Sequence, residues 1–429
     1  MKPQTLKPAL GPFELFFYST GVIIGAGVYS VIGAAAGLAQ SKLWLSFLIG
    51  AVIALLTALS YAEMATAFPV AGGEYVYARR ALPRARWLSF SLGAIIIIGG
   101  SATAATVAVA FGGYLASFVA VPPPVSAIAV LAVCTLVGVL GITQSSWANI
   151  VFTLAEIAGL FLIIAVAFAF SPETAPSASA SLAPPDVLAA AAVLFFVYLG
   201  FEEVANVAEE ARNPSRDIPR ALFWSLGATT VLYILVGLAV LRLATPEQLA
   251  SSGAPLAAAL HNAWPQATAW LSVIALFATA NTVLITLIAT ARLTFSMGRD
   301  SELPPVLGLL SKRRTPWVAS LLVLALAALL VPIGDIQILA GLSSFSALLA
   351  FLAVNVALVV LRYVEPETVR PFRVPLNLGR LPLLPLGAIA SIVFLLGHFE
   401  REVYFGGALA MAASALIFFV RHRMPRHPH

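Results

Sequence analysis

Two stretches of the chain carry features that a continuous membrane helix would not have, and both could bind a solute. The first is Ser19 to Ser30, where Gly21, Gly25 and Gly27 interrupt an apolar segment long enough to cross a bilayer. Each glycine costs about 1 kcal/mol relative to alanine inside a helix, and unwound backbone in lipid leaves N–H and C=O groups unsatisfied. A break here predicts a binding cavity. The spacing of Gly21 and Gly25 is equally typical of close helix packing.

The second stretch runs from Leu194 to Glu210 and is apolar at first, then abruptly acidic. A lipid-facing helix would not tolerate this pattern, so we expect a second break around Gly200. Glu202 and Glu203 directly follow it as candidate cation ligands, and Glu203 is equally well explained as a tie between the broken helix and its neighbours. Bulky substitutions at Gly25, Gly27 or Gly200 are expected to abolish binding. Alanine at Gly37, beyond the first break, is expected to be nearly silent.

Other polar residues lie deep in apolar segments and share helical faces. Glu156 is the acid deepest in its segment, and burying a charge there costs about 2.5 to 3.5 kcal/mol, which favours a functional role over a structural one. Serines and threonines of such segments also bond their own backbone, so many of them are expected only to pack. One segment has Thr279, Thr282, Thr286 and Thr290 on one face with Asn281 beside them, and another has Gly99, Thr103 and Thr106 on one face with Ser101 nearby.

These residues belong to a chain whose composition excludes a soluble enzyme. Of its 429 residues, 60% are hydrophobic and 10% are charged, which is typical of multispanning membrane proteins. The single cysteine, Cys134, excludes an internal disulfide and a cysteine metal cluster. Neither a nucleophile with its base nor a metal-ligand motif occurs at membrane depth, so we expect no enzyme activity, metal or cofactor. The net charge of +5 indicates topology and contact with membrane lipids and not a nucleic-acid partner.

Windows of about twenty apolar residues predict an all-α protein with twelve transmembrane helices. Every basic residue except Lys42, Arg242 and Arg401 then falls on one side of the membrane. By the positive-inside rule this side is the cytoplasm, and it holds both termini of a protein of the cell (inner) membrane. The predicted spans are 11–38, 43–68, 88–119, 123–142, 147–170, 187–210, 218–242, 267–297, 316–333, 336–361, 381–398 and 403–420.

The two interrupted spans are the first and the sixth, and four intact spans separate them. The sixth therefore enters the membrane from the side opposite to the first, which indicates inverted five-helix repeats with a site at the midplane. A loop rich in proline and small residues, 171–186, divides the two halves. The predicted organisation is a first repeat, 1–170; a second, inverted repeat, 187–362; two peripheral helices, 381–420; and a cytoplasmic tail, 421–429.

Five stretches together resemble the amino acid, polyamine and organocation (APC) superfamily of secondary transporters. Gly21 to Tyr29 is similar to its first-helix glycine motif. The match is strongest over Tyr198 to Glu202 and Ala208 to Arg220, which look like its sixth-helix and following-loop signature. Three stretches agree further along the chain: Asn281 to Pro304, Leu361 with Arg362, and Arg370 to Pro375.

The resemblance implies an amino acid permease that works by alternating access. In that family the substrate carboxylate sits on free N–H groups of the first break, here near Ala26 and Gly27, as the helix dipole favours. Carbonyl groups around Ile23, Phe196 and Tyr198 would hold the ammonium group. An aromatic side chain, Phe196 or Phe201, would close the site. The expected binding residues are Ile23, Ile24, Gly25, Ala26, Gly27, Ser101, Phe196, Tyr198, Gly200, Phe201, Glu202 and Asn281.

Glu156 departs from the pattern of many relatives, which carry a lysine at this place on the fifth helix. Glu156 could carry a coupling proton, ligate a sodium ion with Thr282 or Thr286, or pair with a cationic substrate. The sequence favours a proton-coupled carrier of neutral amino acids. The alternatives are a carrier or exchanger of cationic amino acids, polyamines or other amines, a sodium-coupled symporter and, less favoured, a non-transporting sensor. A channel is disfavoured because the chain repeats internally around its breaks.

Overall fold

The computed structural model describes residues 11–68, 73–83, 85–141, 146–169, 184–206, 211–300 and 302–423. Within these ranges the chain is helical apart from its turns and one two-stranded hairpin. The first half contains α1 (Pro12–Ile24), α2 (Gly27–Ala39), η1 (Gln40–Lys42), α3 (Leu43–Ala67), α4 (Gly73–Ala81), α5 (Arg86–Leu115), α6 (Pro123–Val139) and α7 (Ser146–Ala169). The second half contains α8 (Val187–Leu194), η2 (Phe195–Tyr198), α9 (Glu203–Asn206), α10 (Pro214–Leu243), α11 (Pro246–Ser251), α12 (Pro255–Ala263), η4 (Pro265–Ala267), α13 (Thr268–Arg299), η5 (Pro305–Gly308), α14 (Trp317–Leu330), η6 (Val331–Ile333), α15 (Ile336–Val364), β1 (Asn377–Leu378), β2 (Leu381–Pro382), α16 (Leu383–Leu396) and α17 (Arg401–Arg423).

The lengths and apolarity of the helices are those of an integral membrane protein. In the described part of the chain, six helical stretches are long and apolar enough to cross a bilayer, and the pair α16–α17, bent by 115°, would add a seventh. A helix lies in each of the twelve predicted spans. Several of these helices are short, for example the 14-residue α14, so twelve separate crossings stay a prediction.

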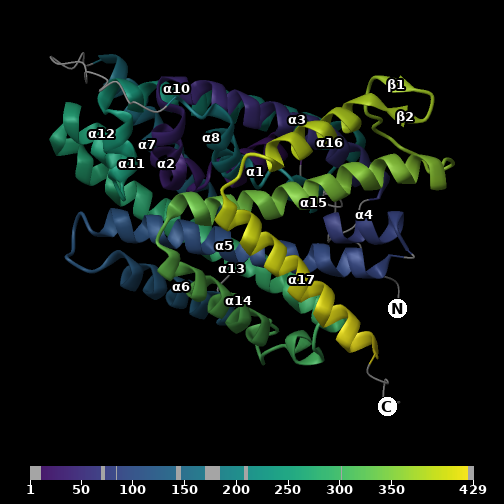
Figure 1. Ribbon diagram of the computed structural model, residues 1–429. Helices are drawn as coiled ribbons and strands as arrows, with labels where there is room; N and C mark the ends of the chain where they lie inside the picture. Colours follow the sequence, from purple (N-terminus) through teal and green to yellow (C-terminus); the bar gives the residue numbers. More distant parts are fainter. Residues whose placement is uncertain are drawn as a thin grey trace.

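The long helices form the centre of the bundle, where α5 packs against both α13 and α15 (Figure 1). Beside them, α10 packs against α3 and α1. The short helices α11 and α12 lie at one end of the molecule, and α4 with the hairpin β1–β2 lies at the other (Figure 1). Because α11 also packs against α2, the segment between α10 and α13 covers one end of the first broken span.

Local sequence explains where many helices begin. Proline occupies the first helical position of α1, α10, α11 and α12, where its missing N–H removes no hydrogen bond. The Asp186 carboxylate caps α8 by accepting from the Ala189 N–H, and Asp335 caps α15 by accepting from the Gln337 and Ile338 N–H groups. These caps fix the starting points of α8 and α15.

Both predicted breaks occur. The first span is divided into α1 and α2 at Gly25, whose φ is +25°. The sixth span is divided into α8, η2 and α9 around Gly200, whose φ is +110°. A side chain is strained at such a positive φ, so glycine is required for the chain to turn at both places. Residues 171–183 of the predicted dividing loop, and Glu209 and Glu210, lie outside the described residues.

Candidate functional site

The two breaks pack against each other, and each places a glycine on the other's backbone. A Cβ atom added at Gly27 would lie 3.1 Å from the Cα atom of Val197. One added at Gly200 would lie 2.7 Å from Val22 Cγ1 and 3.0 Å from the Val22 carbonyl oxygen. Gly27 and Gly200 therefore allow two unwound segments, distant in the sequence, to meet inside the bundle.

Hydrogen bonds from other helices hold the unwound backbone. The Ala26 N–H donates to Thr282 Oγ1 of α13 at 3.0 Å. The Ser30 hydroxyl and N–H both donate to the Ala26 carbonyl, at 2.8 and 3.0 Å. The Ala26 N–H, expected to be free for a carboxylate, is thus occupied by a hydroxyl group that a stronger acceptor would have to displace. The next N–H groups are those of the first turn of α2, which an α-helix leaves without backbone partners.

Tyr233 of α10 joins the two breaks. Its hydroxyl lies 2.8 Å from the Ile23 carbonyl oxygen and 3.2 Å from the Val197 carbonyl oxygen, and its side chain is fully buried. The expectation that the Ile23 carbonyl is free is therefore wrong in part, because it already accepts one hydrogen bond. The Phe196 carbonyl likewise accepts the Leu199 N–H at 3.3 Å. Each carbonyl oxygen keeps a second lone pair that could accept from an ammonium group.

Glu156 of α7 lies close to the first break. Its backbone carbonyl accepts the Tyr29 hydroxyl of α2 at 2.7 Å, and Thr153, one turn earlier, contacts Gly21 of α1. The Glu156 side chain is 1% exposed and hydrogen-bonds Asn281 of α13. No described residue donates to its Oε1 atom. A carboxyl group with one unsatisfied oxygen in an apolar interior is costly unless it takes up a proton or a cation.

The predicted coupling residues occupy different places around this carboxyl group. Asn281, expected in the substrate site, contacts Glu156, whereas Thr282 contacts the break itself. Thr286 lies one turn further along α13 and is partly exposed. Shared ligation of one ion by Glu156 with Thr282 or Thr286 therefore stays a prediction.

The remaining predicted binding residues lie on the second break and on α5. The Glu202 carboxylate accepts the Gly200 N–H at 2.9 Å and so caps the turn at the break. The buried Phe201 ring lies edge-on to Tyr61 of α3, with 5.7 Å between the ring centroids. The Tyr198 hydroxyl donates to the Phe47 carbonyl of α3 at 2.9 Å and therefore points out of the break. Ser101 is buried and donates to the Ile97 carbonyl within α5. Their roles in binding stay predictions.

Sequence reasoning missed Tyr233. It lies in the apolar run of α10, and one tyrosine in such a run is ordinary. The chain offers no local sign that this hydroxyl reaches two distant breaks. Only the packing of α10 against α1 brings it there.

The chain is similar to known permeases and transporters. The family model described as amino acid permease matches residues 10–419. The chain is 30% identical over 416 residues to the branched-chain amino acid permease BcaP of Bacillus subtilis (strain 168), covering 92% of this chain and 88% of that protein. It is 28% identical over 447 residues to the methylthioribose transporter of the same organism, with 98% and 95% covered. It is 30% identical over 386 residues to the vacuolar cationic amino acid transporter 8 of Arabidopsis thaliana, with 84% and 65% covered.

Proposed function

This chain belongs to the amino acid permease family, and from that membership we propose that it is a secondary active transporter that carries amino acids across the cell membrane by alternating access. The observation that carries the proposal is the meeting of the two breaks, with Gly27 against Val197 and Gly200 against Val22. In a membrane protein such unwound backbone is tolerated where it is buried or lines a cavity. In the proposed topology, the breaks would offer backbone donors and acceptors near the midplane, where a carrier holds its substrate.

The proposed site would bind both ends of an amino acid. The N–H groups at the start of α2 lie at the positive end of a helix dipole, which favours a carboxylate. The second lone pairs of the Ile23 and Phe196 carbonyls would accept from the ammonium group. Thr282 would release the Ala26 N–H when the carboxylate arrives, so binding and a movement of α13 would be linked.

The proposed topology has twelve spans and two inverted repeats. In it, α1 to α7 form one repeat, α8 to α15 form the other, and α16 and α17 lie outside both. Basic residues place both termini in the cytoplasm under this topology. The end of the bundle with α4 and the β1–β2 hairpin would then face the cytoplasm, and α11 and α12 would face outward.

Neutral amino acids are the favoured substrates. The acids near the breaks, Glu156 and Glu202, would repel a second carboxylate in a poorly screened site. One relative is named as a permease of branched-chain amino acids and another as a transporter of cationic amino acids, so the relatives include both neutral and cationic substrates. A carrier or exchanger of cationic amino acids or other amines is the second candidate, because Glu156 has an unsatisfied oxygen that could accept from a cation.

A panel of competitors tests this substrate class. In proteoliposomes that contain the purified protein, unlabelled alanine or leucine is expected to displace a radiolabelled neutral amino acid. Aspartate and glutamate are expected to compete at least about tenfold less well, because like charges repel in the low-dielectric interior. Arginine and lysine separate the two candidates, since strong displacement by them would favour the cationic carrier. Displacement by glutamate better than by alanine, leucine or arginine would contradict the proposal.

Replacing Tyr233 with phenylalanine tests whether the bridge between the breaks supports binding. The variant keeps the ring but leaves the Ile23 carbonyl without its donor. An unsatisfied buried polar group costs about 1 to 3 kcal/mol, so substrate affinity is expected to fall by roughly tenfold. Tyr404→Phe is the matched control, because its hydroxyl donates to the Leu396 carbonyl at 2.6 Å in α16–α17, away from the breaks. Equal affinities of Tyr233→Phe and the parent protein would show that the bridge is unimportant for binding.

A further inference from the structure

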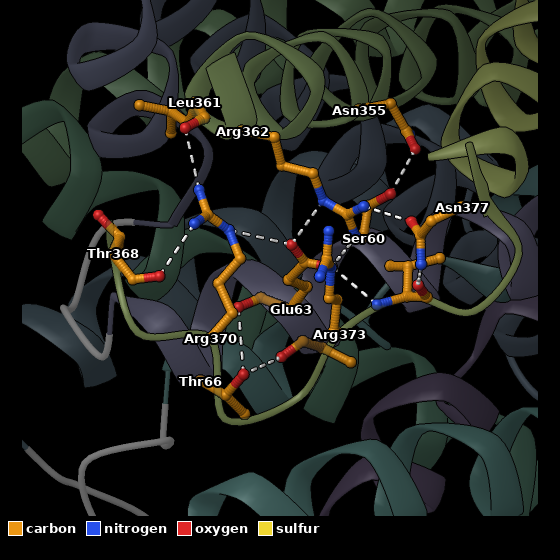
Figure 2. Close-up of polar contacts among 12 residues, drawn as sticks. Ser60, Glu63, Thr66, Asn355, Leu361, Arg362, Thr368, Arg370, Arg373 and Asn377 are labelled. Atoms are coloured by element: carbon orange, nitrogen blue, oxygen red, sulfur yellow. Dashed lines mark hydrogen bonds and ion pairs between the residues drawn. The ribbon is translucent and has the colours of Figure 1, made fainter. Parts of the chain in front are cut away.

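A polar seam joins α3 to α15 near the end of the bundle that holds α4, and nothing in the proposed function uses it (Figure 2). At the end nearest α4, the fully buried Glu63 carboxylate forms an ion pair with the Arg362 guanidinium, whose side chain is 3% exposed. The Arg362 Nε atom donates to Glu63 Oε1 at 2.9 Å, and Nη2 donates to Oε2. Arg370 Nε lies 3.2 Å from Oε1, and the Val374 N–H donates to Oε2 at 2.7 Å.

Polar contacts between α3 and α15 continue further into the bundle. One turn from Glu63, the Ser60 hydroxyl donates to Asn355 Oδ1 at 2.7 Å, and Asn355 Nδ2 reaches Thr57 Oγ1 at 3.4 Å. Asn355 precedes Arg362 by seven residues, which is two helical turns, so both lie on the face of α15 that meets α3. We call Thr57, Ser60, Glu63, Asn355 and Arg362 the polar seam.

The segment that follows α15 covers the end of the polar seam at Glu63. Arg370 donates to the carbonyl groups of Leu361 and Thr368, both at 3.0 Å. Arg362 also donates to Asn377, whose Nδ2 donates to the Val374 carbonyl at 2.7 Å. Figure 2 shows Arg362 and Arg370 meeting at Glu63, with Asn377 beside Arg362. One carboxylate thus fastens the end of α3 to α15 and to residues 365–382.

Aromatic side chains connect the seam to the second break. Tyr61, beside Ser60 on α3, and Phe351, one turn before Asn355 on α15, lie with their ring centroids 5.5 Å apart. Both contact Phe201, at 5.7 and 5.1 Å, and Phe351 also contacts Phe195 at 5.9 Å. Phe195 and Phe201 lie on either side of Gly200. The spacing between α3 and α15 therefore decides where the aromatic residues of the break sit.

Physical chemistry favours a positioning role for this seam over a purely stabilising one. A buried ion pair adds little net stability compared with apolar packing, because both charges lose their water. Where such pairs are retained, their best-supported use is to fix one arrangement of the elements they join. Here the carboxylate is held by three residues, Arg362 of α15 and Arg370 and Val374 of the following segment, so another spacing of α3 and α15 would break its bonds with Arg362.

We propose that Glu63 is a positioning residue that, through the polar seam and the Tyr61–Phe351 pair, holds α3 and α15 as one unit and thereby fixes the second break for substrate binding. The link to substrate rests on the proposed function. The link between the seam and the break rests on the contacts alone. Movement between the facing states then takes place at other interfaces, and α3 and α15 stay together throughout.

Hydrogen exchange of the full-length protein tests the link without any substrate. In Glu63→Gln, exchange of the backbone amides of residues 195–203 is expected to rise by about tenfold, within the range for residues of one hydrogen-bonded network. Exchange in α13 is expected to stay unchanged, which separates a local effect from general loosening. The control is Glu365→Gln, which breaks the Arg80–Glu365 pair, whose side chains are 48% and 28% exposed. Arg80 lowers the pKa of Glu365 through its hydrogen bond, but this exposed pair does not touch the break, so no change is expected there.

A covalent tether supplies the second arm of the experiment. In a Cys134→Ser background, Ser60→Cys and Asn355→Cys are joined by a short bifunctional thiol reagent. Before the reagent is added, the double-cysteine protein is expected to exchange faster at 195–203, because it lacks the Ser60–Asn355 hydrogen bond. Closing the tether is expected to restore both slow exchange at 195–203 and substrate affinity, whether Glu63 is kept or replaced by glutamine. If Glu63→Gln does not fold, Asn355→Ala replaces it in the exchange measurement with the same expected direction.

Three results would overturn the inference: unchanged exchange at 195–203 in Glu63→Gln, failure of the tether to restore slow exchange, or loss of transport when the tether is closed in the double-cysteine protein that keeps Glu63. The proposed function is tested by a different result. If the parent protein binds and carries no amino acid, while the exchange results are as expected, then the seam positions the break and the substrate proposal is wrong.

Discussion

Gly200→Ala is expected to reduce amino acid uptake by roughly 10- to 100-fold, although the change adds only one methyl group. The backbone at this position has a φ of +110°, which strains any other residue by about 1 to 3 kcal/mol. The added Cβ would also lie 2.7 Å from Val22 Cγ1 and 3.0 Å from the Val22 carbonyl oxygen. The second break would have to move away from the first, and the backbone groups of the two breaks would no longer face one substrate.

Initial uptake rates in proteoliposomes, together with thermal unfolding of the purified protein, measure this effect. Gly227→Ala is the control, because a Cβ atom there meets no other atom within 4 Å. Gly37→Ala, which the sequence suggests as a silent change, is unsuitable. Its Cβ would lie 2.8 Å from Ala250 Cβ of α11, so α2 or α11 would have to shift to accommodate it, and a silent change stays a prediction that this contact opposes. Full uptake by Gly200→Ala would refute the proposed role of the second break.

Glu156→Gln is expected to separate substrate binding from ion coupling. The amide has the shape of the neutral carboxylic acid, and it can still bond with Asn281. Binding and exchange of substrate across the membrane should therefore persist. If Glu156 takes up and releases a coupling proton, as we propose, accumulation driven by an inward proton gradient should fall to the level of exchange alone, because the amide cannot do so.

Paired measurements of counterflow and gradient-driven uptake distinguish the possible couplings. If Glu156 instead ligates sodium, replacement of sodium by choline at constant pH will stop uptake by the parent protein, and sodium-stimulated binding will be absent in the variant. Glu156→Asp, which keeps the charge on a shorter side chain, serves as the control and should retain part of the coupling. Should Glu156→Gln concentrate substrate as well as the parent does, with the same pH and sodium dependence, the carboxyl group is structural.

The breaks could be predicted from the sequence because their causes are local. The sequence itself shows three closely spaced glycines in an apolar segment, and it shows acidic residues directly after Gly200. The positive φ values of Gly25 and Gly200 agree with this reading. Glu156 also stood out, because an acid deep in an apolar segment is costly wherever its neighbours lie.

The partners of these residues could not be predicted, because they depend on packing between distant helices. Tyr233 bridges the breaks from α10, and Glu63 meets Arg362 across almost 300 positions. Neither residue differs locally from an ordinary membrane tyrosine or a helix-end acid. The close contact at Gly37 could not be predicted for the same reason, since α11 packs against α2 from a segment in which the sequence predicts no helix.

The reciprocal contact of the two breaks also has a consequence for how this chain can change over generations. Gly27 lies against the Val197 backbone, and Gly200 lies against the Val22 carbonyl group. Because smaller side chains at positions 22 and 197 would leave these backbone atoms in place, no substitution there could make room for a larger residue. The φ of +110° restricts Gly200 further. Each half of the chain therefore fixes a glycine in the other half, and both glycines should persist while the residues around them diverge.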